Sequence, residues 1–335
     1  MKKKILLNVL SLWLFIFSTA QDIHFSQYFS SPMNLSASEL GNFESDYRAV
    51  LNYRNQWSAV GDAYETIAMG VERQFYWFNQ KFSGGLYFAN DKSGGIDLQV
   101  NQMYFGVAYH SVISYHQLHI GAQFGWVFKS FDKSKVTLLE QFDNTNGYFN
   151  SNLSNHEAYY ENANYPDLNF GASWSRKLYH FEPFAGVALH HVLKPKETFY
   201  ENNNSLHQRL TLYGGVINNF TDRIDIIPIF KLMIYSSAKE YIAGVNVIYK
   251  FREPFFTIKK ALFGAHFRDP VNFKSDALIP VLGVYLKYFY AGVSYDVNVS
   301  KYKSATNRRG AIEFSLIYLG LKTKSNQRTF PCDRY

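Results

Sequence analysis

Acidic and tyrosine side chains are concentrated in one polar, asparagine-rich segment, residues 129–167. Tyrosine supplies a large amphipathic contact area at little entropic cost, and long loops on a rigid scaffold commonly carry recognition residues. The chemistry that this pattern indicates is therefore protein recognition. Together with three residues of a later loop, the predicted partner-binding residues are Asp132, Glu140, Asp143, Tyr148, Tyr159, Tyr160, Tyr165, Lys194, Lys196 and Phe199.

The run Asp143-Asn144-Thr145-Asn146-Gly147 in this segment resembles the start of a calcium-binding loop. Such a loop requires a bidentate glutamate at its twelfth position. Ser154 occupies that position instead. We therefore predict a turn here and no calcium site.

Ten histidines could form a metal or catalytic site. His190 and His191 are adjacent on an expected strand, so their side chains face opposite sides and cannot both bind one ion. His110, His119 and His180 have no carboxylate at a recognisable ligand spacing, and a G-x-S-x-G nucleophile motif is absent. No catalytic, cofactor-binding or metal residue is predicted. Serine, histidine and asparagine side chains that are distant in the sequence could still meet inside a barrel, which keeps a membrane-embedded hydrolase as a third alternative.

The composition excludes some classes of protein. The net charge of +7 and pI near 9.1 come from dispersed Lys and Arg without a basic run, so nucleic-acid binding is not predicted, whereas contact with lipid and anionic lipopolysaccharide fits. The single Cys332 cannot build an internal disulfide framework. Aromatic residues make up 18% of the chain, as expected for the aromatic girdles of an outer-membrane barrel.

The elements that must position these residues are strands. In the segment LHIGAQFGWVF, residues 118–128, large apolar residues alternate with small or polar ones. A strand with one face in lipid and one in a polar lumen has this pattern. The same period of two predicts fourteen strands, at residues 46–56, 64–73, 82–90, 98–110, 116–129, 166–178, 182–192, 208–218, 225–235, 240–250, 260–268, 277–285, 288–299 and 309–319.

The connections between these strands alternate in length. The odd-numbered ones include the longest, at residues 130–165 and 193–207, and the even-numbered ones are mostly short. Bacterial barrels have long extracellular loops and short periplasmic turns, and an even strand count places both termini in the periplasm. We therefore predict an all-β, transmembrane antiparallel β-barrel; a soluble β-sandwich is the alternative fold.

Two features conflict with this assignment of strands and connections. The connections near residues 74–81 and 251–259 are long for periplasmic turns. Pro228 and Pro280 fall inside predicted strands, although a closed barrel has no free edge that tolerates a missing N–H donor. We expect these two strands to begin at the proline or to contain a bulge.

The chain divides into four predicted parts. Residues 1–20 have a basic start, an apolar run and small residues before Gln21, which is typical of a signal peptide cleaved near Ala20/Gln21. Residues 21–45 form a periplasmic arm or a lumenal plug, residues 46–320 the barrel, and residues 321–335 a periplasmic tail. No later apolar run is long enough for a membrane-spanning helix. Candidate periplasmic contacts are Phe25, Tyr28, Phe29, Phe330, Cys332 and Tyr335.

Several segments resemble the PorP/SprF family of the Bacteroidetes type IX secretion and gliding-motility machinery. The resemblance extends over nearly the whole mature chain. It is carried by Gln21-Asp22, Phe25-Ser26-Gln27-Tyr28-Phe29-Ser30-Ser31-Pro32, Asn34-Leu35, Tyr47-Arg48, Asn52-Tyr53-Arg54-Asn55-Gln56-Trp57, Asn90-Asp91-Lys92, Gly94-Gly95, His191, Pro195-Lys196-Glu197, Phe199, residues 209–214, Ser294-Tyr295-Asp296-Val297, Ser300, Gly310, Glu313-Phe314-Ser315-Leu316 and Pro331-Cys332.

This resemblance implies a non-enzymatic protein, integral to the outer membrane, that functions in protein secretion or cell-surface anchoring. Its implied partners are the C-terminal domain of a secreted surface protein or adhesin and type IX components, including a periplasmic ring. A machinery component and a dedicated adhesin anchor both fit. The alternative function is an outer-membrane channel or transporter for small solutes, because fourteen strands could enclose a lumen.

Overall fold

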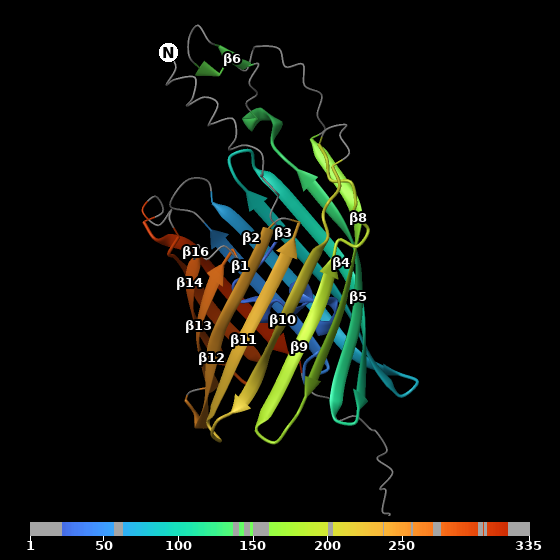
Figure 1. Cartoon of the computed structure of the whole chain (residues 1–335), viewed down its shortest axis with the longest axis vertical. Helices are drawn as coiled ribbons and strands as arrows, with labels where there is room; N and C mark the ends of the chain where they lie inside the picture. The colour runs from blue at the N-terminus through green and yellow to red at the C-terminus, as the bar shows by residue number, and fades with distance from the viewer. Residues whose placement is uncertain are drawn as a thin grey trace, which may run out of the picture.

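A computed structural model shows a closed antiparallel β-barrel of fourteen strands, which confirms the predicted fold class (Figure 1). The structure describes residues 22–56, 63–136, 141–143, 148–149, 161–199, 204–236, 238–255, 257–270, 276–300, 304 and 307–320. The barrel strands are β1 (Tyr47–Gln56), β2 (Tyr64–Trp77), β3 (Gln80–Ser93), β4 (Leu98–Ile113), β5 (His116–Ser130), β8 (Asn162–Arg176), β9 (Phe181–His190), β10 (Arg209–Asn219), β11 (Ile224–Tyr235), β12 (Ala238–Phe255), β13 (Ile258–Asp269), β14 (Ala277–Tyr285), β15 (Phe289–Asn298) and β16 (Arg309–Leu319).

Each strand pairs with its neighbour in the chain, and β1 closes the barrel against β16. The small strands β6 (Phe142–Asp143) and β7 (Tyr148–Phe149) form a separate two-stranded sheet within the connection from β5 to β8. We call the end of the barrel with this connection the long-loop end. The opposite end, with turns such as Phe78-Asn79, is the short-turn end.

Strand β5 shows why the sequence forms a barrel wall. Its large apolar residues, such as Ile120 and Phe124, are exposed on the outer face. The residues between them, such as His119 and Gln123, are buried on the lumenal face. A two-residue period places alternate side chains in lipid and in the lumen, as predicted from the sequence.

Both prolines lie inside continuous strands, so the expectation that their strands begin or bulge there is wrong. Pro228 is aligned with Val245 of β12, and Pro280 with Ala265 of β13. On the other side of each proline the ladder lacks two pairs and then resumes in the same register. The missing N–H therefore interrupts the bonding to one neighbour without changing the register.

The two connections that seemed long for periplasmic turns are short. Strands β2 and β3 remain paired as far as Trp77 and Gln80, so Phe78-Asn79 alone form the turn. Likewise β12 runs to Phe255 and β13 begins at Ile258. Consecutive aromatic residues such as Phe75-Tyr76-Trp77-Phe78 hid these strand ends, because they break the alternation of large apolar and small or polar residues.

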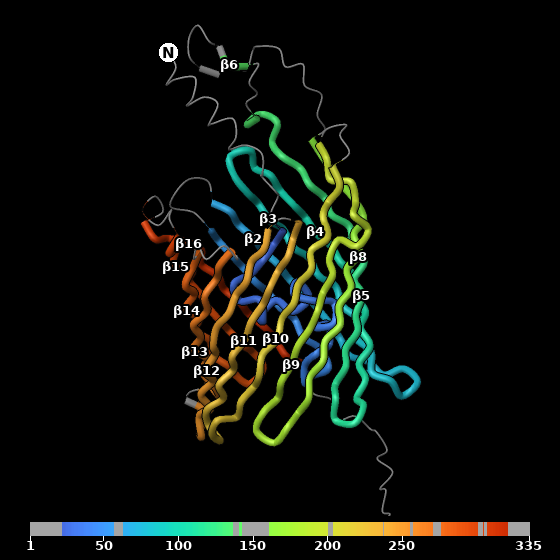
Figure 2. The backbone as a smooth tube through the Cα atoms, viewed as in Figure 1, coloured from blue at the N-terminus to red at the C-terminus, as the bar shows by residue number. Residues whose placement is uncertain are grey.

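Residues 22–45, the lumenal segment, lie inside the barrel (Figure 2), and most of their side chains are buried. The segment contains three short helices, η2 (Tyr28–Ser30), α2 (Pro32–Leu35) and η3 (Ala37–Glu39). Its first described residue, Asp22, lies beside His191 at the long-loop end, and Gly41 lies beside His110 near the short-turn end. The chain therefore traverses the lumen before it turns back into β1.

This path differs from the expectation that both termini lie on the same, periplasmic side, because the first and last residues that the structure describes lie at opposite ends of the barrel. Strand β16 does end beside the start of β1, since the Gly320 N–H donates to the Tyr47 carbonyl at 2.9 Å. Asp22, however, lies at the other end of the barrel, because the lumenal segment separates it from β1. An even strand count fixes where the barrel begins and ends, but it does not fix the path of a segment before the first strand.

Candidate functional site

A cluster of buried charges holds the beginning of the lumenal segment. The Glu313 carboxylate of β16 accepts hydrogen bonds from the backbone N–H groups of Ser26 at 2.7 Å and Gln27 at 2.9 Å. The Arg54 guanidinium of β1 pairs with Glu313 and with Asp296, the latter at 3.1 Å. The side chains of Arg54 and Glu313 are 3% and 1% exposed. We call this group the lumenal clamp.

Strands β13 and β15 contribute one further cation, Arg268, and one carboxylate, Asp296, to the clamp. Arg268 pairs with Asp296 at 2.9 Å, and the Ser26 hydroxyl lies 3.0 Å from Asp296. Two guanidinium groups thus face two carboxylates, and the Ser26 hydroxyl lies between them. Buried ions are tolerated only with such pairing and hydrogen bonding, so the segment and the wall stabilise each other.

The end of the lumenal segment is held by different contacts. Gly41 N–H donates to Glu72 of β2 at 2.6 Å, and Tyr213 of β10 donates to Glu39 at 2.5 Å. Helix η3 also packs closely on the wall, where a Cβ at Gly121 would lie 2.1 Å from the Ala37 carbonyl oxygen. These contacts and the clamp attach the segment to strands on several sides of the barrel.

At the long-loop end the segment begins in a second charged group. Asp22 pairs with Arg209 at 2.7 Å and with His191 at 2.8 Å, and the other ring nitrogen of His191 lies 2.8 Å from Asp167. Tyr104 donates to Asp167 at 2.6 Å. His191 directly follows β9, and its ring bridges the segment and the wall.

This environment shifts two pKa values. Burial alone lowers the pKa of His191, but Asp22 and Asp167 outweigh it and raise the pKa to about 9. Burial alone raises the pKa of Asp22, but Arg209 and His191 outweigh it and hold that pKa well below its usual range. The imidazolium and the carboxylate are therefore both charged at neutral pH.

The long-loop end carries a raised wall. Residues 162–169 of β8 pair with β5 beyond the last pairing of β8 with β9 (Figure 1). The connection after β9 folds against this wall. Its Val192 N–H donates to the Leu168 carbonyl at 3.0 Å, Lys129 pairs with Glu197, and the rings of Phe131 and Phe199 meet edge to face at 4.9 Å.

The described residues of the predicted partner-binding set take different positions. Asp132 is exposed and caps the short helix η4 (Lys133–Lys135), and Lys194 and Lys196 are exposed on the connection after β9. Phe199 is half-buried against Phe131. Tyr165, in contrast, is 4% exposed and faces the lumen, so it is not a surface contact, because its place in the alternation of β8 turns it inward.

Other members of this set cannot be placed. Glu140, Tyr159 and Tyr160 lie outside the described residues, as do the side chains of Asp143 and Tyr148. The described ends nevertheless bring two loops together at one end of the barrel.

The predicted periplasmic contacts are also placed differently where they are described. Phe25 and Tyr28 are 2% and 6% exposed, and Phe29 packs edge to face on His266 at 5.9 Å. They fill the lumen instead of presenting a periplasmic surface, because the segment turns into the barrel. Phe330, Cys332 and Tyr335 lie outside the described residues, as does the predicted signal peptide.

Sequence reasoning missed the members of the clamp. A signal was present, since Arg54 and Glu313 are charged residues inside strands of a barrel and must face the lumen. Their pairing was not readable, because 258 intervening residues separate them and only closure of β1 on β16 brings them together. His191 was weighed only as a metal ligand, whereas it serves as an ion-pair partner.

A serine and two histidines meet inside the barrel, near the short-turn end. The Ser83 hydroxyl lies 2.7 Å from His110 Nε2, and the Nδ1 atoms of His110 and His119 lie 2.5 Å apart. Such spacing resembles a nucleophile and its base. Ser83 is fully buried under the lumenal segment, so no substrate reaches the hydroxyl in this arrangement.

The described part of the chain lacks two further features. No three or more His, Cys, Asp or Glu side chains there form a group that could hold a metal ion. No helix there is long and apolar enough to cross a membrane.

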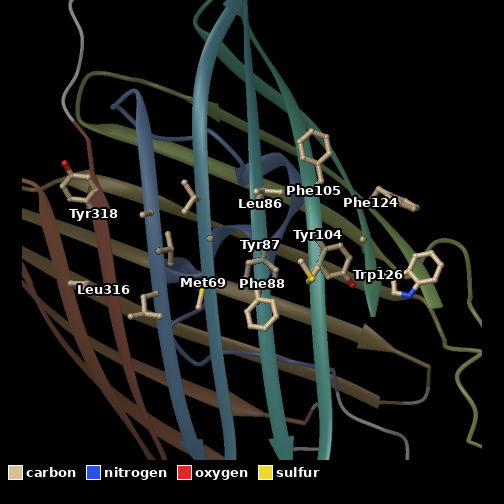
Figure 3. Close-up of a pocket in the computed structure, with 17 residues that line it drawn as sticks. Met69, Leu86, Tyr87, Phe88, Tyr104, Phe105, Phe124, Trp126, Leu316 and Tyr318 are labelled. Carbon is tan, nitrogen blue, oxygen red and sulfur yellow. The ribbon is translucent and has the colours of Figure 1, made fainter. Parts of the chain in front are cut away.

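A wide apolar groove lies on the outer face of the barrel (Figure 3). This groove, of about 670 Å³, crosses strands β16, β1, β2, β3, β4 and β5. Its lining is almost entirely apolar and includes Leu51, Met69, Leu86, Phe105 and Leu316. Two spaces among the described lumenal residues, in contrast, are small and lie between polar side chains that surround the segment.

The chain is similar to one known protein family. The model of a family described as type IX secretion system membrane protein PorP/SprF matches residues 17–318. No curated protein sequence matches the chain.

Three solved structures are similar to the fold at low identity. The Ralstonia pickettii toluene transporter TbuX has a TM-score of 0.53 and 10% identity, with 88% of this chain and 94% of TbuX covered. The monoaromatic hydrocarbon channel CymD has a TM-score of 0.52 and 10% identity, covering 87% and 93%. The P. putida toluene transporter TodX has a TM-score of 0.50 and 10% identity, covering 86% and 93%. These likenesses show the barrel fold alone.

Proposed function

The chain belongs to the PorP/SprF family of type IX secretion system membrane proteins, and from this premise we propose that it anchors a cell-surface protein, or supports its export, by binding that protein's C-terminal domain. It does so as a non-enzymatic outer-membrane barrel, in a secretion or gliding apparatus. The long-loop end faces the cell exterior in this proposal, as in other bacterial barrels.

The observation that carries the proposal is the occupied lumen. The lumenal segment is attached to the wall by Glu313, Asp22, Glu39 and Gly41, which are spread along its length. A barrel filled by a well-bonded segment is a rigid scaffold and not an open pore. Holding another protein at the membrane requires such a scaffold.

The raised wall at the long-loop end supports the location of the binding surface. Strands β5 and β8 extend there beyond β9, and the connection after β9 packs against them through Val192 and Phe199. Exposed Asp132, Lys194 and Lys196 belong to this surface. Because this platform is rigid, a loop that it supports loses less conformational entropy when it binds a partner.

The short-turn end is the proposed side of the machinery. Strand β16 ends there at Leu319, so residues 321–335 start from that end. We assign contact with type IX components, including a periplasmic ring, to this end.

Deletion of the long connection tests the proposed surface. Residues 137–160 are replaced by a short Gly-Ser linker, which retains the paired ends Ser130 and Asn162. The variant is expected to fold into a heat-modifiable barrel that no longer co-purifies with its surface partner from native membranes in mild detergent. A matched variant that replaces residues 301–306 in another long-loop-end connection should retain the partner. Equal co-purification by both variants would contradict the assignment.

A channel for small solutes is the second candidate, because the fold is similar to that of the transporters TbuX and CymD. Conductance in a planar bilayer distinguishes the two functions. The intact protein is expected to be silent, whereas a variant lacking residues 22–45 is expected to conduct. A steady open pore in the intact protein would favour transport over anchoring.

A further inference from the structure

The outer groove differs from an ordinary lipid-facing wall because it is a depression with a polar end. Its lining includes Ala49 of β1, Val71 of β2 and Leu86 of β3, the last of which is labelled in Figure 3. Behind it the wall rests on the lumenal segment, with Met33 and Leu40 buried against its inner side. The groove lies on the membrane-facing side, so its ligand must come from the bilayer.

Strand β2 fixes the level of the groove in the membrane. Its outward residues between Glu65 and Arg73 are apolar, namely Ile67, Met69 and Val71. Eight residue steps span about 26 Å along a strand. At the usual strand tilt this corresponds to about 20 Å across the membrane. Glu65 and Arg73 therefore bound this apolar stretch, and past Arg73 the outward face continues toward the short-turn end with the aromatic residues Phe75 and Trp77.

Arg73 is an exposed cation at the edge of this groove. It is the next outward residue after Val71, which lines the groove. No carboxylate among the described residues lies within ion-pair distance of its guanidinium. On β3 its aligned neighbour is Gly84, which has no side chain.

Two tyrosines accompany Arg73 at this level. Tyr47 of β1 is its aligned partner across the strands and is 39% exposed. The ring of Tyr318, which lines the groove, lies 6.0 Å from that of Tyr47. The groove thus ends in one guanidinium and two phenol groups that are hydrogen-bonded to each other, so the guanidinium and one phenol hydroxyl remain to donate to a ligand.

We propose that this groove binds one anionic glycerophospholipid, with its acyl chains on the apolar wall and its phosphate at Arg73, Tyr47 and Tyr318. A guanidinium matches the geometry of a phosphate, and tyrosines at a membrane interface join an apolar body to a polar tip. The apolar lining matches the acyl chains and the cation matches the headgroup. The site is independent of the surface at the long-loop end.

Native mass spectrometry tests this site on the delipidated, folded full-length mature protein in mild detergent. The probes are phosphatidylglycerol, uncharged diacylglycerol and inorganic phosphate. The wild-type protein is expected to bind one phosphatidylglycerol saturably, in preference to the other two probes. Arg73→Gln should weaken this binding about tenfold, the effect of losing one charged hydrogen-bonding contact.

Two further variants make the result specific. Arg252→Gln removes an exposed arginine at the same end, outside the groove, and should leave the affinity unchanged. Ala49→Phe fills the groove and should weaken both lipids. Retention of heat-modifiable migration shows that each variant is folded. Equal affinities for Arg73→Gln and Arg252→Gln, or equal binding of phosphatidylglycerol and diacylglycerol, would overturn the proposal.

Discussion

Glu313 is the residue on which the lumenal clamp centres. Its two carboxylate oxygens accept the N–H groups of Ser26 and Gln27, and it also pairs with Arg54. One side chain therefore satisfies two backbone donors of the segment and one cation of the wall. In a buried site, each of these groups would destabilise the folded state if it had no hydrogen-bonding or ion-pair partner.

Glu313→Ala is expected to destabilise the folded barrel by about 3–5 kcal/mol, because it leaves the Arg54 charge buried without this partner. The midpoint of urea unfolding in detergent measures the loss. Lys133→Gln is the matched control, since it breaks an exposed pair with Glu161 that is worth at most about 1 kcal/mol. A clamp variant as stable as this control would show that the cluster does not hold the segment.

His191 makes the attachment of the segment dependent on pH. Its pKa is raised from the ordinary 6.5 to about 9, so its contribution is complete below pH 6.5 and is lost as the pH rises to about 9. This shift corresponds to a contribution on the order of 3 kcal/mol. The pKa of Asp22 is lowered, so its contribution is complete above its ordinary value and is lost under more acidic conditions.

We therefore expect unfolding midpoints of the wild-type protein to fall between pH 6.5 and 9, and His191→Asn to abolish most of that dependence. His180→Asn, at an exposed turn, should behave like the wild type. A wild-type midpoint that is constant over this range would contradict the assigned role of His191.

At the scale of elements, close packing of helix η3 on the wall sets how the lumen is filled. Gly121 and Gly171 face Ala37 and Ser36, and a Cβ at either glycine would lie within 2.2 Å of the segment. Strands β5 and β8 thus bring their small residues to the same place. The large residues of these strands face lipid on the other side.

Gly121→Val is expected to expel helix η3 from its place, because overlap with the Ala37 backbone cannot be relieved by a rotamer change. We expect faster proteolysis of residues 22–45 and a destabilisation of at least about 1–3 kcal/mol, the usual cost of overpacking. Gly84→Ala, whose Cβ would have only ordinary contacts at 3.7 Å or more, should change neither. Equal rates of proteolysis of residues 22–45 in both variants would show that the position of η3 does not depend on this contact.

At the scale of the whole molecule, the first and last residues that the structure describes lie at opposite ends of the barrel. Asp22 is at the long-loop end and Gly320 is at the short-turn end. An N-terminal residue therefore shares one end with the surface proposed to bind the exported protein.

An epitope inserted directly after Gln21 is expected to be detected by antibody on intact cells, because the adjoining Asp22 lies at the end proposed to face outward. An epitope after Tyr335 should be detected only after permeabilisation. An epitope within residues 301–306 serves as the surface control. Detection of the Gln21 epitope only in permeabilised cells would contradict either this path or the proposed orientation, and the control distinguishes the two.

The sequence by itself determined the barrel and its strands. Leu118–Phe128 and the other alternating segments predicted fourteen strands, and each of the fourteen barrel strands overlaps its prediction. A wall between lipid and a polar lumen imposes a period of two on each strand separately, so local pattern suffices. Family membership was also readable, because its motifs are short and sequential.

Only the tertiary structure decided what lies inside the barrel. Residues 22–45 have no alternation, so nothing local distinguished a periplasmic arm from a plug. Their place is set by Glu313 and Arg209, which lie more than 180 residues away in the chain. Likewise, the pairing register of the strands and the closure of the barrel decide that Tyr165 faces the lumen. They also decide that Arg73 lies at the end of the apolar groove. Pairings of this kind depend on which strands become neighbours, and that is a property of the closed sheet and not of any one segment.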